Sequence, residues 1–130
     1  MACWFITGCS TGIGREIASA ALEAGHSVAV TARNTGSVAD FADRFGDRAL
    51  VLPLDGTTAQ RIAAAVAAAE AAFGGIDVLV NNAGYGYMAA VEEGDDAEVR
   101  KLFDTNYFGV VDTLKAVLPG MRARRRGHVI

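Results

Sequence analysis

The chain of 130 residues contains little cysteine, proline or histidine, with two residues of each. Two cysteines are too few for a disulfide framework, and the cysteines and histidines lie too far apart for the short ligand spacings of a zinc site. No segment approaches the roughly 18 consecutive apolar residues of a membrane span, and no basic segment precedes the apolar residues near the N-terminus. We therefore expect a cytoplasmic, metal-free protein that has neither an export signal nor a membrane anchor.

Positive charge is not in excess, because 12 lysines and arginines face 15 acidic residues and leave a net charge of -3. No overall positive field therefore attracts nucleic acid or anionic lipid. A basic cluster at Arg122, Arg124, Arg125 and Arg126 has no interleaved aromatic residues, so it favours a solvated helix end over a nucleic-acid site. With 52% apolar residues, this length predicts one folded domain over residues 1–130, which recognises its partners through a local site.

Short apolar runs alternate with alanine-rich helical segments along the whole chain. The pattern predicts strands at residues 2–7, 27–32, 49–54 and 78–80, and helices at 15–24, 38–45 and 95–118, with another helix that Thr57 or Thr58 caps and Gly74-Gly75 ends. Pro119-Gly120 is expected to end the last helix. This order is typical of an α/β fold, a Rossmann-type doubly wound parallel sheet. Residues 127–130 resemble the opening of a fifth strand, so we expect the domain to be truncated in or just before that strand.

A glycine-rich segment, Thr-Gly-Cys-Ser-Thr-Gly-Ile-Gly at residues 7–14, joins the first expected strand to the first helix. Backbone amides and the helix dipole face an anion at such a junction. Gly8 permits the tight turn, Gly12 lets a phosphate approach the main chain, and Gly14 lets the helix pack against the strand. The spacing differs from G-x-G-x-x-G and from the phosphate loop of ATPases, and a turn that needs glycine for geometry alone is the alternative. In this position the segment predicts a site for the diphosphate of a dinucleotide.

The residues at the end of the second expected strand indicate which cofactor the protein binds. The place of the acidic residue that would bind a ribose 2′-hydroxyl is taken by Ala32, and Arg33 follows it. A guanidinium can form bidentate bonds to a 2′-phosphate and stack on adenine. Arg33 therefore predicts NADP rather than NAD, with weak additional support from Arg15, although a solvated surface arginine would also fit.

Together with Leu54-Asp55, Asp77-x-x-x-Asn81-Asn82-Ala83-Gly84 and Asn106, the glycine-rich segment resembles the N-terminal half of the short-chain dehydrogenase/reductase family in order and spacing. The resemblance implies hydride transfer between the nicotinamide of NADP and a small-molecule carbonyl or secondary alcohol. It further implies that Asp55 accepts a hydrogen bond from the adenine amino group and that Asn81 ties neighbouring strands together. The diphosphate and adenosine would contact Gly8, Ser10, Thr11, Gly12, Ile13 and Gly14, and the ribose and nicotinamide would contact Asn82, Ala83 and Gly84.

Asn106 matches the family's helix asparagine, which holds a water of the proton relay, so the resemblance implies a catalytic role. A hydrogen bond from Asn106 to a backbone carbonyl within the helix would fit the same position. The family also uses a tyrosine as general acid and a lysine four residues later, and no Tyr-x-x-x-Lys occurs in this chain. In the family that pair follows the fifth strand, so we expect these 130 residues to bind the cofactor without turnover.

Three further expectations concern interactions and side chains outside this pattern. A sheet edge left uncovered after Ile130 predicts a homo-oligomer, aggregation or marginal stability. The alternative function is a non-catalytic nucleotide-binding or dimer-forming module; a Rossmann domain of another type is disfavoured by the glycine spacing. The segment from Tyr85 to Met88 is expected to touch substrate, to pack or to form a dimer contact, and Cys9 is expected to be inert.

Overall fold

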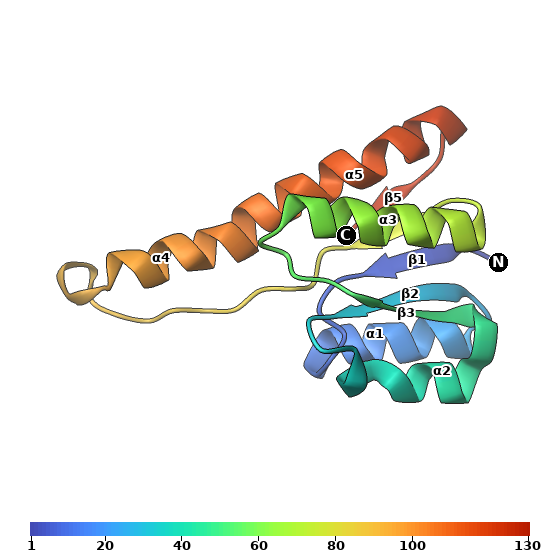
Figure 1. Ribbon diagram of the computed structural model, residues 1–130, viewed down its shortest axis with the longest axis horizontal. Helices are drawn as coiled ribbons and strands as arrows, with labels where there is room; N and C mark the ends of the chain where they lie inside the picture. The colour runs from blue at the N-terminus through green and yellow to red at the C-terminus, as the bar shows by residue number, and fades with distance from the viewer.

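The computed structural model describes residues 1–130 and contains one five-stranded sheet (Figure 1). Its strands are β1 (Cys3–Ile6), β2 (Ser27–Ala32), β3 (Ala49–Pro53), β4 (Val78–Val80) and β5 (His128–Val129). All are parallel, in the order β3-β2-β1-β4-β5. This arrangement confirms the predicted Rossmann-type α/β fold.

Helices cover both faces of the sheet, as Figure 1 shows. On one face lie α1 (Gly12–Glu23) and α2 (Ala39–Phe45), and on the other lie α3 (Ala59–Phe73) and α5 (Gly109–Arg124). Between β4 and α5, α4 (Asp96–Phe103) extends beyond the sheet. None of the helices combines the length and the apolar character that crossing a membrane would require.

The alternation of side chains along the central strands divides the core into two clusters. Phe5 points to the side of α3 and α5, where it packs in a cluster with Ile62 and Val117. Its neighbour Ile6 points to the side of α1 and α2, in a cluster with Leu22. All six residues of β2 are buried. The apolar runs seen in the sequence therefore arise because both sheet faces are covered.

The last predicted helix differs from the structure in length and in regularity. A π-helical segment, Asp104–Phe108, separates α4 from α5, and α5 continues through Pro119 to Arg124. The expectation that Pro119-Gly120 ends the helix is therefore wrong. Proline removes one backbone donor, but Met121 beyond it is buried and Arg124 donates a 2.6 Å hydrogen bond to the carbonyl of Ile76. These tertiary contacts hold the helix together past the proline.

Two arginines of the basic cluster at the end of α5 form contacts within the protein. Arg124 makes the bond to Ile76, and Arg126 forms a 3.2 Å ion pair with Asp77. Both contacts join the C-terminal end of α5 to the start of β4, and Arg125 adopts a left-handed conformation where the helix ends. Arg122, Arg125 and Arg126 are exposed.

Candidate functional site

The loops after β1 and β4 meet in the middle of the sheet, where the chain reverses its direction of travel across the strands. β1 and β4 are neighbours, with Ile6 opposite Val80. The helix after β1 covers one face and the helices after β4 belong to the other side. In open α/β sheets, ligands bind outside the carboxyl ends of the strands at such a switch point. The glycine-rich segment and the Asn82-Ala83-Gly84 loop both lie there.

The glycine-rich segment leaves backbone amides open toward solvent. Gly8 and Gly12 have positive φ values of 70° and 61°, and a Cβ at Gly12 would meet no atom within 4 Å. α1 begins at Gly12, earlier than the predicted Arg15, and Thr11 makes no side-chain cap. The first turn of α1 also contains no acidic residue. Its amides and positive dipole end are therefore available to an anion.

The side chains of the segment divide between the core and the surface. Ile13 is 74% exposed, and Gly12 and Thr11 are also exposed, whereas Ser10 is half-buried. Cys9 turns inward, is fully buried and donates a hydrogen bond of 3.3 Å to the carbonyl of Ile6. Burial raises the pKa of Cys9 to about 11. A thiol with so high a pKa is protonated at neutral pH, in keeping with the inert side chain expected for this position.

Thr7 begins the glycine-rich segment and has a structural role that the sequence did not predict. Its hydroxyl accepts hydrogen bonds from the backbone amides of Asn82, at 3.0 Å, and Ala83, at 2.9 Å. In return, the side-chain amide of Asn82 donates to the carbonyls of Thr7 and Gly8, both at 3.0 Å. This reciprocal set of bonds joins the two loops. The available signal was a threonine at the end of an apolar strand that was expected to be buried, since a buried hydroxyl requires a partner.

Asn81 was expected to tie neighbouring strands together, and in the structure Asn81 and Asn82 each make part of these contacts. The backbone amide of Asn81 bonds the carbonyl of Ile130 at 2.8 Å and so joins β4 to β5. The side-chain contacts that tie the first strand to this loop belong instead to Asn82. Ala83 also lies against the glycine-rich segment, because a Cβ at Gly8 would come within 3.0 Å of its Cα. The cofactor contacts expected for Asn82, Ala83 and Gly84 remain predictions.

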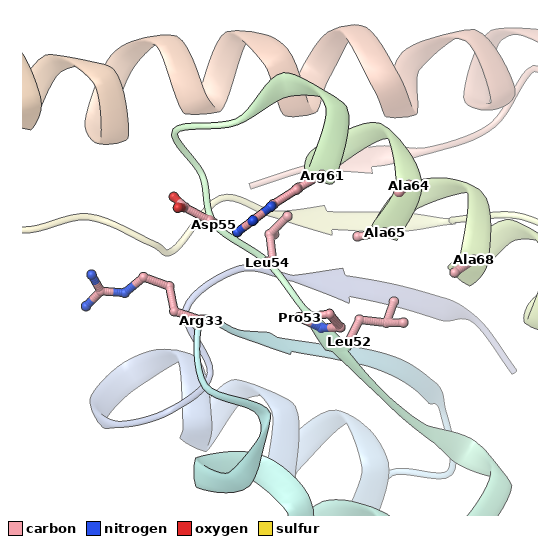
Figure 2. A pocket seen from close by; sticks show the side chains of 9 residues that line it. All are labelled: Arg33, Leu52, Pro53, Leu54, Asp55, Arg61, Ala64, Ala65 and Ala68. Carbon is pink, nitrogen blue, oxygen red and sulfur yellow. The ribbon is translucent and has the colours of Figure 1, made fainter.

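A hollow lies at the carboxyl end of β3, between this strand and α3 (Figure 2). Its volume is about 460 Å³. The charged residues Arg33, Asp55 and Arg61 gather at one end, and the apolar lining is formed by Leu52, Pro53, Leu54, Ala64, Ala65 and Ala68. We call this hollow the β3 groove. It brings together Arg33 and Asp55, which the sequence placed at the ends of two different strands.

Asp55 is held in one orientation by Thr57. Both the backbone amide and the hydroxyl of Thr57 donate to Oδ1 of Asp55, at 3.0 and 2.7 Å. These bonds, with smaller contributions from Arg61 and Arg33, lower the pKa of Asp55 below its ordinary value. The carboxylate is therefore ionised at neutral pH, and no hydrogen bond within the chain occupies Oδ2. That oxygen can accept a bond from an amino group.

Arg15, in contrast to Arg33, is committed to contacts within the protein. It forms an ion pair with Asp40, donates a 3.1 Å bond to the carbonyl of Ser37 and lies 4.8 Å from the centre of the Phe41 ring. These contacts join α1 to α2 and leave its guanidinium engaged. The weak support that Arg15 lends to a cofactor phosphate stays a prediction.

Asn106 lies in the π-helical segment and holds the loop after β4. Its Oδ1 accepts from the amide of Tyr85 at 3.1 Å, and its Nδ2 donates to the carbonyl of Tyr85 at 2.7 Å. The polar side chain thus bonds a backbone carbonyl, but in a distant loop rather than in its own helix. A π-helical turn is frequent at functional sites because it redirects side chains. Tyr87 also stabilises this region, since its hydroxyl accepts a 3.0 Å bond from the amide of Asp95.

The parallel sheet and the open glycine-rich segment at its switch point define a Rossmann-type protein. A model of the short chain dehydrogenase family matches residues 2–130, and the chain belongs to this family. Oxidoreductase BOA17 of Botryotinia fuckeliana is 42% identical over 127 residues, which are 97% of this chain and 46% of that protein.

Solved structures agree with this assignment. A short-chain dehydrogenase from Streptomyces avermitilis superposes with a TM-score of 0.95 at 43% identity, over 99% of this chain and 48% of the other. A gluconate 5-dehydrogenase from Burkholderia cenocepacia, solved with NADP and tartrate, has a TM-score of 0.89 at 33% identity, over 98% and 51% of the two chains. The chain spans less than half the length of the curated relatives it matches, at 46%, 40% and 42%.

Proposed function

We propose that this chain forms the NADP-binding part of an oxidoreductase that acts on a carbonyl or secondary alcohol of a small molecule. The observation that carries the proposal is the position of Arg33. It is an exposed arginine without an ion-pair partner, at the end of β2 where an acidic residue would select NAD. The family supports oxidoreduction in general, and the NADP-bound neighbour from Burkholderia cenocepacia supports this choice of cofactor.

The residues of the two loops suit an adenine dinucleotide. The open space over Gly12 and the uncapped amides of α1 suit the diphosphate, with Gly8, Ser10, Thr11, Ile13 and Gly14 forming the rest of that turn. Oδ2 of Asp55 suits the adenine amino group, and the guanidinium of Arg33 suits a 2′-phosphate. The nicotinamide, when bound, supplies or accepts the hydride. Asn82, Ala83 and Gly84 would lie along that half of the cofactor.

The residues after β4 would position the nicotinamide end of the cofactor and the substrate beside it. Asn106 holds the backbone of Tyr85 and so fixes the loop that would border the substrate. We place Asn106 in the proton relay by family resemblance, as a residue that orients water. Because the chain contains no Tyr-x-x-x-Lys, we propose that these 130 residues bind NADPH without turning it over.

We also propose that the protein is a homo-oligomer. Val99, Phe103 and Tyr107 follow one another at helical spacing, and each is exposed, as is Phe108. Exposed apolar side chains that follow one another along α4 and the π-helical segment after it are typical of an interface. Sedimentation velocity is expected to show a species larger than the monomer, and a single compact monomer would contradict this proposal.

The main test is a fluorescence titration with NADPH and with NADH, on both the 130-residue chain and the protein at its full encoded length. We expect both forms to bind NADPH more tightly than NADH, and Arg33→Gln to remove most of that difference. We expect NADPH oxidation with carbonyl substrates only where a Tyr-x-x-x-Lys is present. Equal affinity for the two nucleotides would overturn the NADP assignment, and failure to bind either would overturn the cofactor proposal.

A further inference from the structure

We propose that Arg61 is a second specificity-determining residue, which holds the 2′-phosphate of the cofactor together with Arg33. This inference rests on the proposed NADP binding. Arg61 lies in the first turn of α3 and comes to the β3 groove from the opposite side to Arg33. Figure 2 shows its side chain extending toward Asp55, while Arg33 extends from the end of β2. The sequence pattern did not indicate Arg61, because it lies outside every motif.

The two arginines of the groove differ from the others in this part of the chain. Residues 1–76 contain five arginines, of which three have side-chain bonds within the protein. Arg15 and Arg44 pair with carboxylates, and Arg48 donates to backbone carbonyls. Arg33 and Arg61 make no side-chain hydrogen bond and no ion pair. Both guanidinium groups are therefore free to bind a ligand.

The surroundings of Arg61 do not provide an internal partner. On its own helix face the residues three and four positions away are Thr57, Thr58, Ala64 and Ala65, none of which is acidic. The first turn of α3 contains no acidic residue either. Asp55 is the one carboxylate that lines the groove, and it forms no ion pair with Arg61 within 4.0 Å. Oδ1 of Asp55 is already held by Thr57.

The charges in the groove favour a phosphate. Two guanidinium groups and one carboxylate leave an excess of one positive charge beside an apolar lining. A 2′-phosphate would more than offset that positive charge and could accept bonds from both arginines, whereas a 2′-hydroxyl would leave it unbalanced. Arg33 and Arg61 are both exposed, so a ligand can reach their guanidinium groups from solvent.

The test is isothermal titration calorimetry of the protein at its full encoded length with adenosine 2′,5′-bisphosphate and with 5′-AMP. These ligands differ only in the 2′-phosphate. Arg61→Gln is expected to weaken binding of the bisphosphate about tenfold and to leave 5′-AMP nearly unchanged. Arg61→Lys should retain part of the affinity. Arg122→Gln removes the same charge from an exposed position at the end of α5 and should change neither ligand, and thermal unfolding verifies that each variant is folded.

The outcomes separate the inference from the proposed function. If the unmodified protein binds both ligands equally, the NADP assignment fails, and the role of Arg61 fails with it. If the unmodified protein prefers the bisphosphate and Arg33→Gln removes the preference but Arg61→Gln does not, only the role of Arg61 is overturned. An equal loss for both ligands in folded Arg61→Gln would place the residue against the adenine or the 5′-phosphate and would also contradict the inference.

Discussion

The side chain of Asn82 occupies the space into which a side chain at Gly14 would project. A Cβ at residue 14 would collide with Nδ2 of Asn82 and with the carbonyl oxygen of Gly8. These two groups are hydrogen-bonded to each other at 3.0 Å. The glycine at the start of α1 is therefore required by the loop after β4 as well as by the packing of the helix on its own strand.

This relationship predicts different effects for two glycines in the same loop. Gly14→Ala is expected to destabilise the fold by about 1–3 kcal/mol, because the rigid Asn82–Gly8 bond must shift. Gly12→Ala should have a smaller effect on stability, about 1 kcal/mol, since the strain of its positive φ is not accompanied by a collision. Urea unfolding measures both values.

The same two variants should rank in the opposite order for their direct effect on the affinity for NADPH. The methyl group of Gly12→Ala would fill the space proposed for the diphosphate, so affinity should fall although the fold remains. Fluorescence titration of folded protein measures this loss. A Gly12→Ala variant that binds NADPH normally would contradict the position assigned to the diphosphate.

Thr7 is expected to control the stability of the joined loops through its hydroxyl. Thr7→Val keeps the shape of the side chain but leaves the amides of Asn82 and Ala83 without their acceptor, so we expect a loss of about 2 kcal/mol. Thr7→Ser retains the acceptor and should lose clearly less. Chemical denaturation of the three proteins tests this order, and equal stability of the valine and serine variants would show that the hydroxyl is not the stabilising group.

The two buried cysteines predict a decrease of stability at alkaline pH. Burial raises the pKa of Cys3 to about 12 and that of Cys9 to about 11, from an ordinary value of 9.0. The unfolded chain therefore loses these protons first, and the contribution of both thiols is present below about pH 9 and lost as the pH rises toward 11–12.

Urea unfolding between about pH 8 and about pH 10 is expected to show this decrease. The double variant Cys3→Ala, Cys9→Ala, which lacks both thiols, is the control. It should show a smaller decrease than the unmodified protein. Both thiols should also resist iodoacetamide in the folded protein and react after unfolding; rapid alkylation of the folded protein would contradict their burial.

Asn106 is expected to hold the loop after β4 through two bonds to Tyr85. Asn106→Ala removes both, so the amide of Tyr85 should exchange with solvent about tenfold faster or more. Asn106→Asp retains the acceptor but cannot donate to the carbonyl of Tyr85, and should give an intermediate rate. Hydrogen exchange followed by NMR distinguishes these variants, and unchanged exchange in Asn106→Ala would show that other contacts fix the loop.

Local sequence determined the strands, most helices and the glycine-rich turn, because these depend on apolar runs, helical periodicity and glycine at defined positions. The continuation of α5 through Pro119 could not be predicted in this way, because it depends on Met121 entering the core and Arg124 reaching Ile76. The π-helical segment that directs Asn106 toward Tyr85 likewise has no local signal in the pattern that predicted one helix over 95–118.

The charged residues show most clearly which features local sequence predicts and which depend on the tertiary structure. The sequence by itself placed Arg15 beside the glycine-rich turn and Arg33 at the end of a strand. Because of these positions, both arginines were candidates for binding a phosphate. The tertiary structure gives them different surroundings, because the packing of α1 on α2 provides Arg15 with a carboxylate partner in Asp40. The placement of α3 along β3 brought Arg61 to the groove and left it, like Arg33, without one. Pairing between distant charges depends on the distances set by the whole fold, and local spacing does not determine those distances.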